Sequence, residues 1–261
     1  MKNIFKKIAY LNLIFLFFSI PTSYSKTTKS LTIFAEPNLA SALTEISRLY
    51  SKESAVVVSI ELGSASDMIN RIEEGEDSDL FISAHKTWID DLKQKGLVDI
   101  YNINHITDDT LVLVTSTNNK KIPKTLKVKG LKFNEALSIL NKNRFDLVVD
   151  HSSSSLGQHS DHLVDDKKFR SIRLYKKLPE DRSSAADLIR KNPNIYSVML
   201  GSQINGNDNF QAISTLKNRE IFYEALVVAG DSMENAREFS NFLKNDRSQK
   251  IFRKNGFVGE Y

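Results

Sequence analysis

Two serines stand in one short turn of this sequence, immediately before a stretch with helical spacing. The segment LGSASDMINRI (62–72) places Ser64 and Ser66 on either side of Ala65. One of these hydroxyls could be a nucleophile at a strand-to-helix turn. Alternatively, the hydroxyls and the free backbone N–H groups at the start of a helix could hold an anion. The two chemistries belong to different classes of protein.

A hydrolase needs more than a serine in a turn. The nucleophile-elbow pattern requires a second glycine where this sequence has Asp67. A general base is also needed, and the spacing of the histidines singles none of them out. An exported serine hydrolase that uses Ser64 or Ser66 is therefore the alternative reading, and it requires a histidine within reach of one hydroxyl. The candidates are His85, His105, His151, His159 and His162.

Anion binding finds support in three further polar turns. In open α/β sheets, ligands bind at the carboxyl ends of strands, where helix N-termini point outward. Asn, Asp and Ser are also ordinary N-cap residues, so a single turn of this kind carries little weight. Four turns at predicted strand ends favour a site for a dehydrated oxyanion. Besides GSAS (63–66), the turns are EPN (36–38), HSSSS (151–155) and EDRSS (180–184).

The segments between these turns alternate between strand-like and helix-like patterns. A first series runs from LTIFA (31–35) to a helix that ends at Gly96, and a second series begins with TLVLVTS (110–116). Repeated β–α–β order predicts parallel sheets with helices on both faces, and two series predict two lobes. A strand at 223–230 and the C-terminal helices could return to the first lobe.

The N-terminus has the three parts of a secretory signal peptide. Lysines precede a short apolar run from Ile8 to Ile20, and small residues follow, so we expect a signal peptide at 1–25 and a periplasmic protein. An uncleaved anchor is the alternative. With no cysteine, neither a lipid-attached lipoprotein nor disulfides are expected. Without the three lysines of 1–25, the formal charge of +4 falls to about +1, which gives little reason to expect nucleic acid as a partner.

Segments spread over nearly all of the mature chain carry a family resemblance. They are LTIFAEPNLASAL, IELGSASDMINRIEEGEDSDLFISAHKTWIDDLKQKGLVD, TLVLVTS, PEDRSSAADLIRKN with YSVMLGSQ, and IFRKNGF. Together they resemble the periplasmic molybdate-binding proteins, the type II substrate-binding proteins of bacterial molybdate importers. The resemblance implies an α/β fold of the two-lobed type II periplasmic binding protein class, each lobe a mostly parallel sheet flanked by helices. The implied lobes are 26–108 plus 226–261, and 109–225.

The resemblance also implies a function. The protein would be a monomer that captures an oxyanion or another small anion between its lobes and delivers it to an ABC permease in the inner membrane. It would need no cofactor, bind no metal ion apart from a metal oxyanion as its ligand, and catalyse nothing. A binding-protein fold that has lost its transport ligand and acts as an interaction partner is a further alternative.

Carried over position by position, the ligand site departs from the family pattern. Two hydroxyl groups of the family are missing, and each lost hydrogen bond to a charged ligand is worth roughly 1.5–3 kcal/mol. The implied ligand contacts are Asn38 in place of a serine, Ala65 in place of a second serine with Ser64 and Ser66 beside it, backbone N–H groups near Leu156 and Arg182, the Ser155 hydroxyl, and Leu200 in place of a tyrosine.

Arg182 is the one full positive charge among these positions. A guanidinium offers a planar fork that fits a carboxylate or a phosphate. This motivates the hypothesis that the ligand is a different, organic anion. The alternative is that Arg182 points into solvent.

Overall fold

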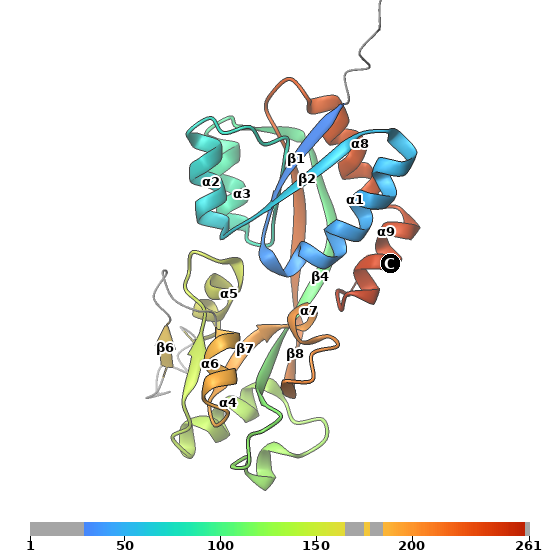
Figure 1. Ribbon diagram of the computed structural model, residues 1–261. Helices are drawn as coiled ribbons and strands as arrows, with labels where there is room; N and C mark the ends of the chain where they lie inside the picture. The colour runs from blue at the N-terminus through green and yellow to red at the C-terminus, as the bar shows by residue number, and fades with distance from the viewer. Residues whose placement is uncertain (1–28, 165–174, 178–184, 259–261) are drawn as a thin grey trace, which may run out of the picture.

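The computed structural model describes residues 29–164, 175–177 and 185–258. The expected signal peptide, the EDRSS turn and Arg182 lie outside the described residues. The described chain forms two α/β halves that are connected by two long strands (Figure 1). We call them the upper half, which contains β1 to β3, and the lower half, which contains β5 to β7.

One mixed sheet of eight strands runs through both halves, in the order β2-β1-β3-β8-β4-β7-β5-β6. In the upper half, β1 pairs in parallel with β2 and β3, and in the lower half β5 pairs in parallel with β6 and β7. The parallel strands are β1 (Ser30–Ala35), β2 (Val57–Leu62), β3 (Leu80–Ser83), β5 (Leu147–Val149), β6 (Tyr175–Lys177) and β7 (Tyr196–Leu200).

The two connecting strands are β4 (Val98–Ser116) and β8 (Phe210–Val228), each of 19 residues. They pair with each other in antiparallel fashion, while β8 also pairs with β3 and β4 also pairs with β7. Their shared ladder shifts register at four places, and such bulges bend and twist a ribbon. The strands predicted at 110–116 and 223–230 are therefore parts of longer elements that serve both halves.

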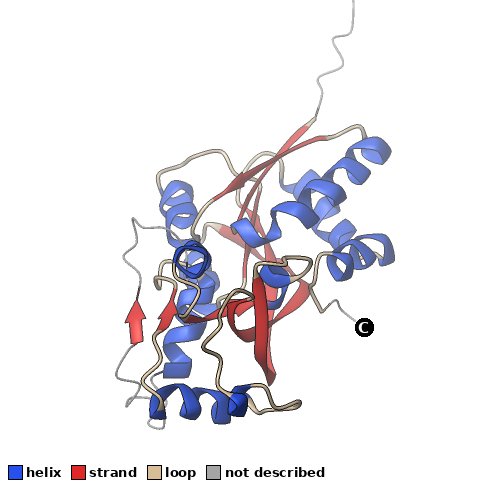
Figure 2. Cartoon of the chain, turned by 60° about the horizontal axis from the view of Figure 1, so that its bottom comes forward, coloured by secondary structure: helices blue, strands red, loops and turns tan. Residues whose placement is uncertain are grey.

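Helices cover both faces of the sheet (Figures 1 and 2). Within the described residues, none of them has the length and apolar character to cross a membrane. The helices are α1 (Ala40–Ser54), α2 (Ala65–Glu73), α3 (Lys86–Gln94), α4 (Phe133–Lys142), α5 (Ser155–Val164), α6 (Ala185–Lys191), α7 (Gly201–Ile204), α8 (Met233–Leu243) and α9 (Asp246–Lys254), with 3-10 turns η1 (Pro37–Leu39) and η2 (Lys124–Leu126).

The upper half has two hydrophobic cores, one on each face of the sheet. Successive side chains of a strand point to opposite faces. Leu31 and Ile33 accordingly pack with α1, α8 and α9, whereas Phe34 and Phe81 pack with α2 and α3 on the other face. Because both cores are fully buried, the sheet fixes where the first turn of α2 lies.

A close backbone contact fixes the start of α5. A Cβ atom placed on Gly157 would lie 1.8 Å from the carbonyl oxygen of His151 in the preceding loop. We therefore expect Gly157→Ala to lower the free energy of unfolding by about 1–3 kcal/mol, because backbone must shift to admit the methyl group. Gly230→Ala is the control, since nothing lies within 4 Å of its added Cβ. Urea denaturation measures both, and equal midpoints would contradict this account of the α5 turn.

Candidate functional site

The N-terminus of α2 lies against the lower half. Ser64 is the N-cap, and its hydroxyl oxygen accepts a hydrogen bond from the N–H of Asp67 at 3.2 Å. The Ser64 and Ser66 hydroxyls lie 3.2 Å apart, and the N–H of Ser66 donates to the carbonyl oxygen of Ser153 in the lower half. Among the described residues, no group accepts a hydrogen bond from the N–H of Ala65. This turn thus joins the two halves and keeps one first-turn donor unused.

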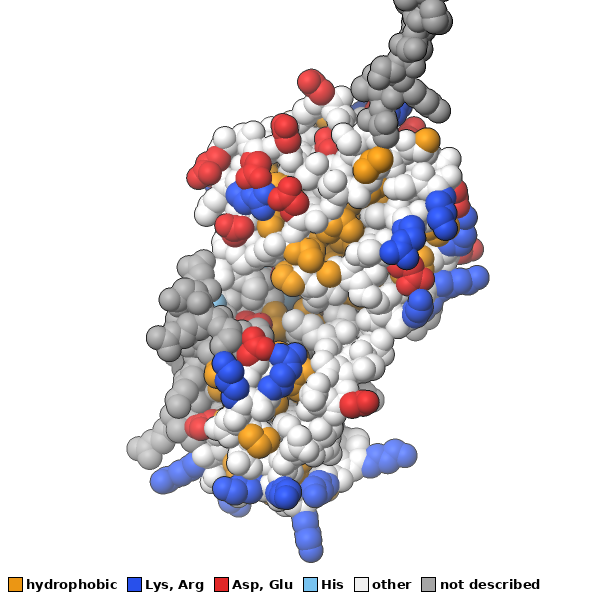
Figure 3. Space-filling view, in the orientation of Figure 1, with side chains coloured by type: hydrophobic (Ala, Val, Ile, Leu, Met, Phe, Trp, Pro, Cys, Tyr) orange, Lys and Arg blue, Asp and Glu red, His pale blue; other side chains and the backbone are white. Residues whose placement is uncertain are grey.

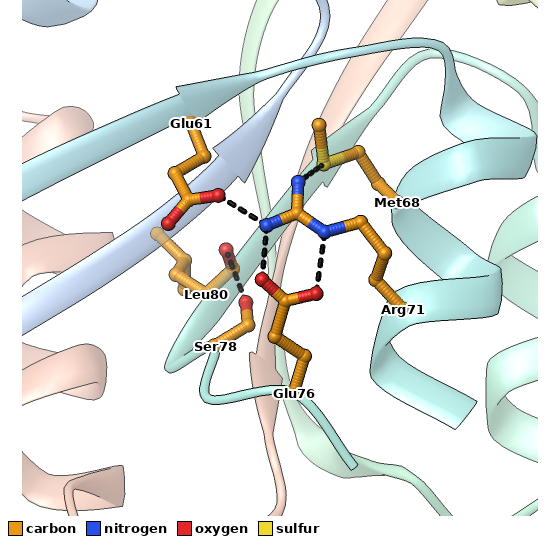
Figure 4. A network of polar contacts seen from close by, with 6 residues as sticks. All are labelled: Glu61, Met68, Arg71, Glu76, Ser78 and Leu80. Atoms are coloured by element: carbon orange, nitrogen blue, oxygen red, sulfur yellow. Dashed lines mark hydrogen bonds and ion pairs between the residues drawn. The ribbon is translucent and has the colours of Figure 1, made fainter. Parts of the chain in front are cut away.

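An arginine holds α2 at its other end (Figure 4). Arg71 donates to the carboxylates of Glu61 on β2 and Glu76, and it lies over the ring of Phe34, 4.3 Å from its centroid. These two carboxylates raise the pKa of the guanidinium. Arg71 therefore anchors the helix, and its charge is already neutralised.

The carboxylate of Glu36, in the turn after β1, contacts the lower half. Glu36 is buried, and its carboxylate oxygens accept hydrogen bonds from the backbone N–H and the hydroxyl of Ser155, the first residue of α5. The hydroxyl of Ser83 lies 3.3 Å from that of Ser155. Burial raises the pKa of Glu36, and hydrogen bonds from Ser155, Ala84 and Ser83 oppose this rise. The N-terminus of α5 already holds an anionic side chain of the protein.

A second buried carboxylate, that of Asp109, lies near the hydroxyl groups that Asn38 contacts. The side-chain amide of Asn38 donates to the hydroxyl oxygen of Tyr223 at 2.7 Å and to that of Ser202 at 3.3 Å. Asp109 accepts a hydrogen bond from the N–H of Ser202 at 3.2 Å. Burial raises the pKa of Asp109 to about 6, and it also raises that of Tyr223.

No described lysine or arginine forms an ion pair with Glu36 or Asp109. On the face in Figure 3, one group of lysine and arginine side chains lies at the far end of the lower half. Among the described residues, these two carboxylates bond to hydroxyl and N–H groups. The exposed lysines of this end include Lys120, Lys121, Lys124 and Lys127.

A cavity of about 450 Å³ lies between α3, α5 and the two long strands. Ala84, whose backbone bonds to the Glu36 carboxylate, is one of its lining residues. The His85 and His159 rings meet edge to face at 5.0 Å, and Nε2 of His159 lies 2.9 Å from the carbonyl oxygen of Ala84. Apolar side chains face the same space. The lining residues include Ala84, His85, Ile89, Lys93, Leu111, His159 and Ile221.

The structure brings most of the sequence-predicted residues to this boundary between the halves. Asn38, the Ser64–Ser66 turn and Ser155 lie there with the contacts described above. The side chains of Leu156 and Leu200 pack into the buried core, so only their backbone groups could face a ligand. Glu36, Asp109 and Tyr223 were not predicted. Glu36 is the charged residue of the predicted EPN turn, and its charge at a strand end was the signal that could have identified it.

In the described part of the chain, no histidine forms a hydrogen bond with either serine of the hydrolase alternative. The hydroxyls of Ser64 and Ser66 bond with each other and with the N–H of Asp67. Three histidine rings bond with backbone groups: His85 with Thr87, His159 with Ala84, and His151 with the N–H of Ser153. The carbonyl oxygen of Ser153 accepts from the N–H of Ser66. The ring of His105 bonds with the carboxylate of Asp108. The side chain of His162 lies outside the described residues.

The raised pKa of Asp109 predicts a pH-dependent stability. Between its ordinary value of 3.8 and about 6, the folded protein binds more protons at this group than the unfolded chain does. The contribution of Asp109 to the free energy of unfolding is therefore full below the lower value and falls as pH rises through the window. We expect Asp109→Asn to gain up to about 3 kcal/mol relative to the wild type between about pH 4 and pH 8. Urea denaturation across this range checks it, and a pH-independent difference would contradict it.

Comparison with known proteins agrees with this architecture. The family model for bacterial extracellular solute-binding proteins matches residues 31–258. The molybdate-binding protein ModA of Escherichia coli (strain K12) is 25% identical over 232 residues, which cover 87% of this chain and 88% of ModA.

Solved structures show the same fold. The periplasmic molybdate-binding protein of Azotobacter vinelandii superimposes with a TM-score of 0.65 at 15% identity, covering 88% of this chain and 100% of that one. PEB3 of Campylobacter jejuni with bound L-phospholactate gives 0.66 at 17% identity, with the same coverage. The predicted α/β class, a two-lobed type II periplasmic binding protein fold, is confirmed. Since the family model spans nearly the whole described chain, the protein belongs to the family of bacterial extracellular solute-binding proteins.

Proposed function

We propose that this protein is the periplasmic solute-binding component of an ABC importer and captures a small oxyanion between its halves. The observation that carries this proposal is the meeting of two helix N-termini at one boundary. The first turn of α2 contacts the loop before α5 through Ser66 and Ser153, and the first turn of α5 already holds the carboxylate of Glu36. Helix N-termini bind anions through their free N–H groups and their partial positive charge.

The relatives support an oxyanion as the ligand class. ModA of Escherichia coli is named for molybdate, and PEB3 was solved with L-phospholactate, an organic anion that carries an oxyanion group. The hydroxyl and N–H donors of the described turns suit a ligand of this kind. Molybdate and tungstate are accordingly our first candidates.

A phosphorylated or carboxylated organic anion is the second candidate. The cavity of about 450 Å³ beside Ala84 supports it, because a tetrahedral oxyanion alone does not need that space. The apolar part of its lining, which includes Ile89, Leu111 and Ile221, would suit a short carbon skeleton.

Transport requires the halves to move and a membrane partner to receive the solute. We propose lobes at 26–108 plus 226–261 and at 109–225, with β4 and β8 as the hinge. Export by residues 1–25, a monomeric state and delivery to an inner-membrane permease complete the proposal. It includes no catalytic step.

Thermal unfolding with added anions tests the ligand class. Binding to the folded state raises the midpoint by mass action, and an anion at 100 times its Kd adds about 2.7 kcal/mol. We expect a shift with at least one of molybdate, tungstate, phosphate and L-phospholactate, and none with chloride at equal ionic strength. If no anion of this panel shifts the midpoint, the proposed function is wrong.

A proline at position 65 tests the site itself. Ala65 is the first residue of α2, where proline is tolerated, and the preceding Ser64 has the extended backbone that proline requires (φ −68°, ψ 150°). Ala65→Pro removes one N–H donor, and we expect the Kd for the bound anion to rise roughly 10- to 100-fold.

The matched control is Asp246→Pro, which makes the same change at the first residue of α9 and should leave the Kd unchanged. Circular dichroism and melting without anion show whether each variant folds. An Ala65→Pro protein that folds and binds like the wild type would refute the assignment of α2 to the site.

A further inference from the structure

At the N-terminus of α5, the carboxylate of Glu36 already accepts hydrogen bonds. Glu36 is only 4% exposed, and both of its oxygens are directed at Ser155, one at the N–H and one at the hydroxyl. Ser83 and Ala84 contribute further hydrogen bonds from the end of β3. These donors are of the type that an incoming oxyanion would use.

The charge balance makes this arrangement unfavourable for a second anion. Glu36 and Asp109 are both buried, and no described cation pairs with either. Like charges brought together in a desolvated site cost several kcal/mol. A dianion can settle at α5 only if the Glu36 carboxylate leaves its donors or loses its charge.

The contact also joins the two halves. Glu36 follows β1 in the upper half, whereas Ser155 opens α5 in the lower half. A carboxylate at a helix N-terminus is a stabilising interaction. The same side chain therefore pulls the halves together and fills the donors of the solute site.

We propose that Glu36 is an internal anion that bridges the two halves and competes with the solute oxyanion for the N-terminus of α5. This inference rests on the proposed function, because it assumes that an oxyanion is the solute. In this proposal, Glu36 sets the Kd of the protein for its solute.

Glu36→Gln tests the competition, since it removes the charge and keeps an oxygen that can accept from Ser155. Titration calorimetry at pH 7 with sodium molybdate and with potassium phosphate measures the Kd. We expect the variant to bind at least one of the two roughly tenfold more tightly than the wild type, or more. Glu74→Gln is the control: it makes the same substitution at the exposed C-cap of α2, and its Kd should equal that of the wild type.

The outcomes separate the two proposals. If the wild type binds an anion and Glu36→Gln binds it equally well or more weakly, the competition is refuted while the proposed function stands. If neither protein binds any anion of the panel, the proposed function fails and the competition fails with it.

Glu36→Ala provides a readout that needs no ligand. It removes the bridge to Ser155 as well as the charge, so we expect a larger radius of gyration by small-angle X-ray scattering without added anion, whereas Glu36→Gln and Glu74→Gln should match the wild type. Circular dichroism verifies that the variant is folded. A folded Glu36→Ala protein with an unchanged radius would refute the bridging role.

Discussion

The placement of negative charge between the halves is the constraint on which the site depends. Glu36 and Asp109 are buried there, and each is stabilised by N–H and hydroxyl donors, with no cation of the described residues paired to it. A buried carboxylate or donor that loses its hydrogen-bond partner costs free energy. The donors therefore stabilise a buried anion only while the surrounding turns hold them in place. The site is therefore a set of rigid turns, and the side chains that fill them decide which anion is accepted.

The two long strands supply that rigidity. β4 and β8 belong to both halves, so the turn after β1, the start of α2 and the start of α5 are positioned from one continuous sheet. The register shifts in their ladder bend and twist the ribbon. The hinge that we propose would let the two helix N-termini come together and separate with both cores intact.

The sequence predicted the elements and the turns better than it predicted the side-chain contacts. Apolar spacing predicted most helices and strands. The polar strand-end turns led to Asn38, Ser64 and Ser155 as ligand contacts, and the structure places these residues at the boundary between the halves. Periodicity missed more than half of β4, because polar residues such as Asn104 and Asp108 interrupt the apolar pattern there. It also missed Glu36, since nothing local shows that this charge is buried against a helix far along the chain.

The central claim is that an oxyanion is held by the first turns of α2 and α5. Backbone amide NMR during a titration with molybdate and with phosphate tests it most directly, because each amide reports on its own surroundings. The account predicts saturable shifts, for at least one of the two anions, at the N–H groups of Ala65 and Ser155, with α9 unaffected. Shifts confined to the exposed lysines around Lys124, or no saturable shift with either anion, would contradict it.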